Sequence, residues 1–204
     1  MNAGLQPEPG HLVEVFLQPG EYHFGDRNTR IRTLLGSCVA VVIWHPLLQI
    51  GGMCHVLLPR RSGRRGSTTL DGRYADEALQ LLLQAAAAAG TGAGEYQAKL
   101  FGGGNMFPDY LRQPRLKRSA GPLPDRPAST APGSLPHRID CSLCRRQQCG
   151  VGCLNSAAAR QLLLQHGLTL VAEDIGGDGH RQVIFDIGSG YTWVRQTPVH
   201  AAIR

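Results

Sequence analysis

Residues 33–59 read TLLGSCVAVVIWHPLLQIGGMCHVLLP, and this stretch decides how the rest of the chain is expected to fold. Its first part, residues 38–44, is rich in Val and Ile on both faces, which is typical of a strand covered on both sides. Residues 45–48 form a short loop, and a second apolar run follows. The stretch therefore predicts a buried β-hairpin.

The predicted hairpin brings a thiol and an imidazole together. If Trp44 and Gln49 close the loop, Cys38 lies directly opposite His55. Directly opposed side chains have Cβ atoms about 4.5–5.5 Å apart, close enough to share a proton. A slip of one residue would separate them, so the hypothesis depends on the register. A cysteine in an apolar strand is more often a small core residue, so spacing alone leaves the structural interpretation open.

Gly36 and Ser37 support the interpretation of Cys38 as a catalytic residue. A Gly-Ser turn before a buried strand leaves backbone N–H groups unpaired near the sulfur, where they can hold an oxyanion. A free cysteine has a pKa near about 8.5, and a neighbouring imidazolium favours the thiolate. These residues predict a cysteine nucleophile beside an oxyanion hole.

The composition favours one globular domain. The 204 residues are enough for a substantial core, and we expect a single domain over residues 1–204. Neither a signal peptide nor a run of about eighteen apolar residues is visible, so a cytoplasmic protein without membrane insertion is expected, with its six cysteines reduced. The net charge of +6 lies largely in irregular stretches without interleaved aromatic residues. This pattern favours a solvated surface or an acidic protein partner over nucleic acid.

The remaining segments predict an α+β fold with two main helices. One helix is expected at residues 74–89, with Asp71 as its N-cap, and the other at residues 157–166, with Asn155 as its N-cap. Besides the hairpin, strands are expected at residues 12–17, 30–34, 97–101, 168–174, 182–186 and 191–195.

A triple glycine, residues 102–104, follows one of these strands. No GK[ST] sequence follows it, so a phosphate-binding loop is not favoured, and the glycines predict a tight turn near the site. Asn105 is then either a substrate contact or a residue favoured by the turn geometry.

A Cys-rich insert is expected at about residues 108–153, where Pro, Arg, Ser and Gly predominate. Cys141, Cys144, Cys149 and Cys153 lie at its end. Four such thiolates can hold a structural zinc or an iron–sulfur cluster, although the spacing matches no standard pattern. A disulfide and unligated thiols are the alternatives. Any metal here is expected to be structural, because the proposed chemistry has its own nucleophile and base in the hairpin.

Four blocks of this sequence, LGSCVAVVIW, GGMCHVLLP, KLFGGGNMF and AEDIGGDGHRQVIFDIGSG, resemble the bacterial chemotaxis protein family CheD. The resemblance implies a layered β-sandwich with flanking helices, in which Cys38 and His55 are catalytic. The family also has a threonine shortly before the cysteine that supports the histidine. Thr33 lies five residues before Cys38 and Arg32 six, so the third position stays open between them. The cysteine cluster departs from the family pattern.

The resemblance implies a protein-glutamine deamidase that converts glutamine side chains of chemoreceptor cytoplasmic helices to glutamate through a thioester, with no catalytic cofactor. The alternative is a non-catalytic adaptor that binds receptors or a phosphatase of the CheC type. A transglutaminase-like reaction, in which an amine intercepts the thioester, is a third interpretation. Only product analysis separates it from hydrolysis.

Overall fold

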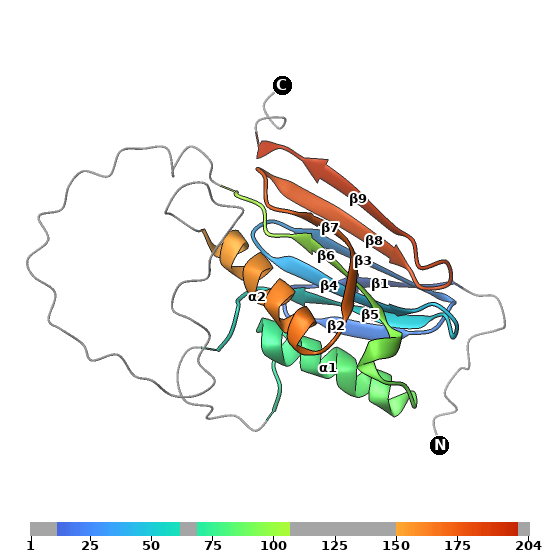
Figure 1. Cartoon of the computed structure of the whole chain (residues 1–204). Coiled ribbons are helices and arrows are strands. Elements are labelled where there is room, and N and C mark those ends of the chain that lie inside the picture. The colour runs from blue at the N-terminus through green and yellow to red at the C-terminus, as the bar shows by residue number, and fades with distance from the viewer. Residues whose placement is uncertain (1–11, 62–68, 107–149, 200–204) are drawn as a thin grey trace, which may run out of the picture.

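The computed structural model describes residues 12–61, 69–106 and 150–199. In this part of the chain two β-sheets stack face to face, and two α-helices cover the outer face of one sheet (Figure 1). The first sheet has the strand order β1-β3-β8-β9, and the second has the order β2-β5-β4-β6-β7. The predicted α+β class, with layered sheets and two flanking helices, is confirmed.

The elements are β1 (Val13–Leu17), β2 (Tyr22–Gly25), β3 (Thr29–Leu35), β4 (Val39–His45), β5 (Ile50–Val56), α1 (Ala75–Ala88), a 3-10 turn η1 (Ala93–Glu95), β6 (Gln97–Gly102), α2 (Val151–Gln165), β7 (Thr169–Ile175), β8 (His180–Asp186) and β9 (Thr192–Thr197).

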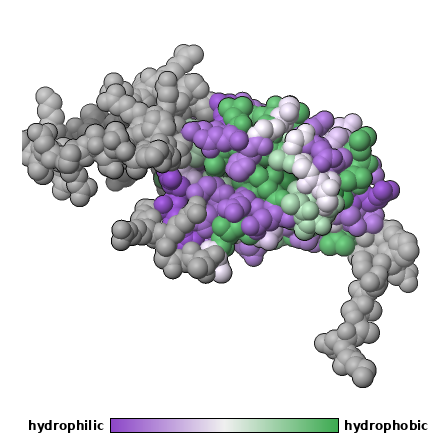
Figure 2. All heavy atoms as spheres, turned by 60° about the horizontal axis from the view of Figure 1, so that its bottom comes forward, coloured by the Kyte–Doolittle hydropathy of each residue, from purple (hydrophilic) through white to green (hydrophobic). Residues whose placement is uncertain are grey.

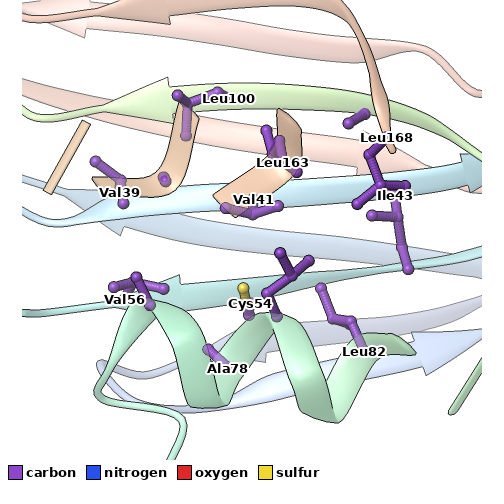
Figure 3. Close-up of a cluster of buried hydrophobic side chains, with 14 of the residues drawn as sticks. Val39, Val41, Ile43, Cys54, Val56, Ala78, Leu82, Leu100, Leu163 and Leu168 are labelled. Atoms are coloured by element: carbon purple, nitrogen blue, oxygen red, sulfur yellow. The ribbon is translucent and has the colours of Figure 1, made fainter. Parts of the chain in front are cut away.

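One hydrophobic core lies between the five-stranded sheet and the helices. Figure 3 shows Val39, Val41 and Ile43 of β4 on the same side of the sheet as Leu82 of α1 and Leu163 of α2. These β4 residues alternate along the strand, so they share one face of the sheet. The helices therefore cover this face, and the thiol of Cys54 on β5 lies within the same core.

A second core lies between the two sheets. The other face of β4, with Ala40 and Val42, packs there together with Met53 of β5, Ile31 of β3 and Phe185 of β8. Both faces of β4 are thus buried, as the continuous apolar run predicted. Cys38 packs against this second core, whereas Cys54 belongs to the first.

The helix boundaries differ from the predictions at their N-termini. Helix α1 has Tyr74 at the N-cap position, and the Asp71 carboxylate binds Arg73 instead of capping the helix. Helix α2 begins four residues earlier than the predicted cap at Asn155, so Asn155 lies inside the helix and is fully buried. The predicted caps were wrong because Asn and Asp also serve as side-chain ligands for backbone and guanidinium groups.

Strand β2 was not predicted, because Gly20 before it and Gly25 at its end were interpreted as turn residues. Gly20 has a positive φ of 89°, as a turn requires, but Gly25 is the last residue of β2 and pairs with Gly51. Most of the insert expected at residues 108–153 lies outside the described residues. Its last residues, 151–153, belong to α2.

The surface on the side of the helices carries both polar and apolar residues. In Figure 2, where the bottom of Figure 1 comes forward, hydrophilic and hydrophobic residues are mixed over this face. Among the described residues, no helix is long and apolar enough to cross a membrane.

Candidate active site

The candidate site lies at one end of the sandwich, where the chain passes from one sheet to the other. Strand β3 ends at Leu35 in the four-stranded sheet, and β4 begins at Val39 in the five-stranded sheet. Only residues 36–38 make this connection. The crossing therefore places the cysteine between the sheets, beside the end of β5.

The predicted hairpin register was wrong by two residues. Ala40, not Cys38, lies opposite His55, because His45 and Ile50 form the last pair before the loop. The loop closes with the N–H of Gln49 donating to the carbonyl of His45, and Gln49 adopts a positive φ of 52°.

The predicted placement of Cys38 and His55 on one face of the sheet is kept in spite of this change of register. A shift of two residues keeps every side chain on its face, because the strand period is two. Cys38 precedes Ala40 by two residues, so it faces the same side of the sheet as His55 and lies diagonally across from it. Diagonal neighbours are about 7–8 Å apart at Cα and less at Cβ, within reach of a long side chain such as histidine.

Thr33 contacts the ring of His55. Its Oγ1 lies 2.7 Å from His55 Nδ1 and donates to the carbonyl of Leu17 at 2.9 Å. A carbonyl oxygen only accepts, so the hydroxyl hydrogen is directed to Leu17, and the oxygen accepts from Nδ1–H of His55. Arg32, the other residue left open by the sequence, faces away and contacts Glu14 on the outer side of its sheet.

The hydrogen bond to Thr33 leaves Nε2 of His55 with a lone pair. This nitrogen is buried and has no hydrogen-bond partner among the described residues. Burial lowers the pKa of His55 to about 4, partly offset by the Leu17 backbone and the charge of Glu21. The ring is therefore neutral near pH 7 and able to accept a proton at Nε2.

Burial has the opposite effect on the thiol. The pKa of Cys38 is raised above its ordinary value because desolvation disfavours the thiolate. The directions of the two pKa shifts favour a neutral thiol and a neutral imidazole in the resting protein over the thiolate–imidazolium pair that the sequence interpretation expected. The proton must move from sulfur to nitrogen during the attack itself.

The turn before Cys38 is held through its carbonyl groups. The N–H of Gly104 donates to Gly36 O at 2.9 Å, and the N–H of Gly103 donates to Cys38 O at 2.7 Å. The carbonyl between them, Ser37 O, accepts from Nδ2 of Asn155 at 3.0 Å. The triple glycine therefore lies against the backbone before Cys38, with Gly102 as the last residue of β6 and Gly103 and Gly104 directly after the strand.

Glycine is needed at this turn because the backbones approach closely. A Cβ on Gly103 would lie 2.1 Å from Ser156 Oγ and 2.7 Å from Gly152 O, and Gly103 has a positive φ of 65°. The glycine turn thus packs directly on the first turn of α2.

Asn155 is the site residue that the sequence interpretation missed. Gly152, Asn155, Ser156, Ala159 and Leu163 form the buried stripe of α2, at the spacing of one helix face. If the helix had been predicted to begin at residue 152, Asn155 would have fallen on its buried face. A polar residue on a buried face needs hydrogen-bond partners, and this signal could have identified Asn155.

Asn105 lies next to the glycine turn and bonds through its backbone to another turn. Its N–H donates to Gly177 O at 2.7 Å, and its carbonyl accepts from the N–H of Gly179 at 3.0 Å. These bonds fit the turn interpretation, and a contact of its side chain with substrate stays a prediction.

The cysteine cluster is only partly described. Cys153 lies in the first turn of α2 and is disulfide-bonded, whereas Cys141, Cys144 and Cys149 lie outside the described residues. The expectation that every cysteine is reduced is therefore wrong for Cys153. In the part of the chain that the structure describes, no three His, Cys, Asp or Glu side chains are grouped as metal ligands.

Comparison with known proteins shows which family this chain resembles. A family model described as CheD chemotactic sensory transduction matches residues 57–116 and 140–196. A Pseudomonas savastanoi pv. phaseolicola protein named "Probable chemoreceptor glutamine deamidase CheD" is 43% identical over 193 residues, which cover 95% of this chain and 90% of that protein. A Dechloromonas aromatica protein named "Probable chemoreceptor glutamine deamidase CheD 3" is 44% identical over 190 residues, 93% of this chain and 91% of that protein.

A more distant relative in Leptospira interrogans, named "Probable chemoreceptor glutamine deamidase CheD 1", is 34% identical over 194 residues, 95% of this chain and 98% of that protein. Cys38 lies on the same face of the sheet as His55, whose ring is hydrogen-bonded to Thr33, and enzymes with a cysteine nucleophile combine a thiol with such an imidazole. The chain belongs to the CheD family.

Proposed function

We propose that this protein is a cysteine-dependent deamidase that converts glutamine side chains of chemoreceptors to glutamate. The names of its relatives, chemoreceptor glutamine deamidases, support the substrate and the reaction. The geometry around Cys38 and His55 supports the chemistry.

The observation that carries the proposal is the unpaired Nε2 of His55. A buried polar atom without a partner costs about 1–3 kcal/mol. Thr33 fixes the ring so that this atom, rather than Nδ1, keeps the lone pair. A non-catalytic adaptor gains nothing from this arrangement, whereas a general base requires it.

In the proposed reaction, Cys38 Sγ attacks the side-chain carbonyl carbon of glutamine while its proton passes to His55 Nε2. A carbon–sulfur bond forms, and the carbonyl oxygen becomes an oxyanion held by the N–H groups of Ser37 and Cys38, in the turn that begins at Gly36. His55 then returns the proton to the leaving nitrogen. The carbon–nitrogen bond breaks, ammonia leaves, and a thioester remains.

Hydrolysis repeats these steps with water. His55 takes a proton from water as its oxygen attacks the thioester carbon, and the same N–H groups hold the second oxyanion. The carbon–sulfur bond breaks, the proton returns to Cys38, and glutamate is released. Thr33 orients the ring throughout, and Asn105 is proposed to contact the substrate. No cofactor takes part in this sequence of steps.

The proposed partners are the cytoplasmic helices of chemoreceptors and, from the family resemblance, a phosphatase of the CheC type. Both place the protein in the cytoplasm. The sequence carries a net charge of +6, which suits association with acidic helices.

The cysteine cluster at residues 141–153 is proposed to be structural. The disulfide of Cys153 supports the disulfide alternative over a zinc or iron–sulfur site. Both kinds of metal site bind reduced cysteine thiolates, and a sulfur in a disulfide bond is oxidised. Elemental analysis and thiol titration distinguish them. One zinc per chain that is lost on Cys144→Ser would support the metal, and a metal-free protein with fewer titratable thiols than cysteines would support the disulfide.

The test of the proposed function is product analysis. A receptor cytoplasmic fragment incubated with the protein should show conversion of glutamine to glutamate by peptide mass spectrometry, whereas a transglutaminase would form amine adducts. Cys38→Ser should abolish the conversion in a folded protein, because the oxygen is far harder to ionise than sulfur. Cys54→Ala, on the opposite face of the sheet, is the matched control and should retain activity. Undiminished turnover by folded Cys38→Ser would refute the assignment.

A further inference from the structure

One side chain of α2 holds both arms of the catalytic hairpin. Asn155 is fully buried, and its Nδ2 donates to Ser37 O at 3.0 Å and to Leu57 O at 2.8 Å. Ser37 directly precedes the proposed nucleophile, and Leu57 follows the proposed base, His55, by two residues. A single amide group therefore connects the strand that leads from the nucleophile with the strand that carries the base.

The bond to Ser37 also determines where the next N–H points. The peptide between Ser37 and Cys38 is trans, since the described chain contains no cis peptide. In a planar trans peptide the C=O and the N–H point in opposite directions. Ser37 O is directed toward Asn155 on the helix side of the sheet. The N–H of Cys38 is therefore directed toward the other side, on which the Cys38 side chain lies.

The neighbouring peptides reinforce this orientation. Gly36 O and Cys38 O accept from the N–H groups of Gly104 and Gly103, so all three carbonyls of the turn are bonded. Neither the N–H of Ser37 nor the N–H of Cys38 donates to the backbone of another described residue. Within the described residues, the turn therefore presents two N–H groups without a backbone acceptor beside the sulfur, while every carbonyl of the turn accepts a hydrogen bond.

The side-chain oxygen of Asn155, Oδ1, indicates that this residue does more than stabilise the packing of α2. Its Oδ1 is buried and finds no hydrogen-bond partner in the part of the chain that the structure describes. A buried unpaired acceptor costs free energy, which a residue selected for packing would avoid. The amide is kept for the two hydrogen atoms that it donates.

We propose that Asn155 is a positioning residue that fixes the oxyanion hole by holding the Ser37–Cys38 peptide. This inference rests on the proposed roles of Cys38 and His55. Asn155 does not contact the substrate; it acts through the peptide whose N–H stabilises the oxyanion. Its loss should weaken binding of the transition state and leave the thiol itself unchanged.

The experiment compares the wild-type protein with Asn155→Ala in three assays. Deamidation of a receptor cytoplasmic fragment gives kcat and KM, and iodoacetamide gives the alkylation rate of Cys38. A peptide with an aldehyde in place of the glutamine carboxamide gives the affinity for a tetrahedral adduct. Alkylation occurs at a saturated carbon and forms no oxyanion, whereas the adduct carries its oxygen in the proposed hole.

Asn155→Ala should lower kcat and the aldehyde affinity by a similar factor, about tenfold to a hundredfold, with KM and the alkylation rate within about twofold of the wild type. The matched control is Ser156→Ala. It removes a buried hydrogen bond to Gly152 O within the same helix and should leave all three measurements unchanged. Wild-type kcat and aldehyde affinity in Asn155→Ala would overturn the proposal. An equal fall in the alkylation rate, or an effect on KM alone, would also overturn it.

If Asn155→Ala does not fold, Asn155→Asp provides the test, because it has nearly the same shape. Its carboxylate cannot donate to Ser37 O, but its protonated form can donate one hydrogen. The activity of Asn155→Asp relative to the wild type should therefore rise as the pH is lowered. A ratio that does not change with pH would overturn the proposal. The chemistry is tested separately by the wild type, since deamidation that survives complete alkylation of Cys38 would overturn the proposed function itself.

Discussion

The neutral, buried imidazole of His55 predicts a specific loss of stability in acid. The pKa of His55 is about 4 in the folded protein, below the value of 6.5 for the unfolded chain, because burial disfavours the charged ring. Between these two values the unfolded chain binds a proton that the folded protein does not bind. The free energy of unfolding should therefore be fully maintained above about pH 6.5 and fall as the pH is lowered toward 4.

The magnitude follows from the two pKa values. When the pH is lowered from about 7.5 to 5, the difference between the two pKa values reduces the free energy of unfolding by about 2 kcal/mol through this one residue. The residue is 1% exposed, so solvent screening does not reduce this figure substantially. The assay is urea denaturation at both pH values, for the wild type and for His55→Gln, whose side chain is neutral at each pH.

The comparison isolates the histidine. Carboxylates such as Asp71, whose pKa is lowered to about 2 chiefly by Arg73, are present in both proteins, so their contribution cancels. The wild type should lose about 2 kcal/mol more than His55→Gln over this pH interval. Equal losses in the two proteins would show that the ring is solvated or already protonated, and would refute the assignment of Nε2 as a buried, neutral base.

Three further predictions concern the same end of the sandwich. Thr33→Val should lower kcat for deamidation about tenfold to a hundredfold, since Nδ1–H of His55 loses its acceptor and the ring is no longer held in one tautomer; an unchanged kcat in a folded variant would contradict this role. The rate of Cys38 alkylation by iodoacetamide should keep rising through neutral pH toward and above about pH 9, because burial raises the thiol pKa; a plateau from acidic pH would indicate a thiolate–imidazolium pair instead. Gly103→Ala should destabilise the protein by about 1–3 kcal/mol in urea denaturation, because the new Cβ would collide with α2, whereas Gly90→Ala, which has a positive φ but no atom within 4 Å of the added Cβ, should cost less.

The sequence by itself determined which residues share a face of the sheet. The alternation along residues 38–56 assigns Cys38 and His55 to one side and Cys54 to the other, and this assignment survived a register error of two residues because strands repeat every two. Short-range features, such as the glycine stops Gly90 and Gly167 after the two helices, were also predictable, since both adopt a positive φ.

The tertiary structure alone decided how the site is completed. The hairpin loop closes at the pair His45 and Ile50, with Gln49 at a positive φ of 52°, and the hydrophobic pattern encodes neither feature. Thr33 reaches His55 from the opposite sheet, and Asn155 reaches Ser37 from a helix 118 residues further along the chain. Local periodicity specifies the face on which a side chain lies, but not which face of another element packs against it. That choice is made when the two sheets and α2 bury their apolar surfaces together, so the partners of the hairpin could be identified only in the folded protein.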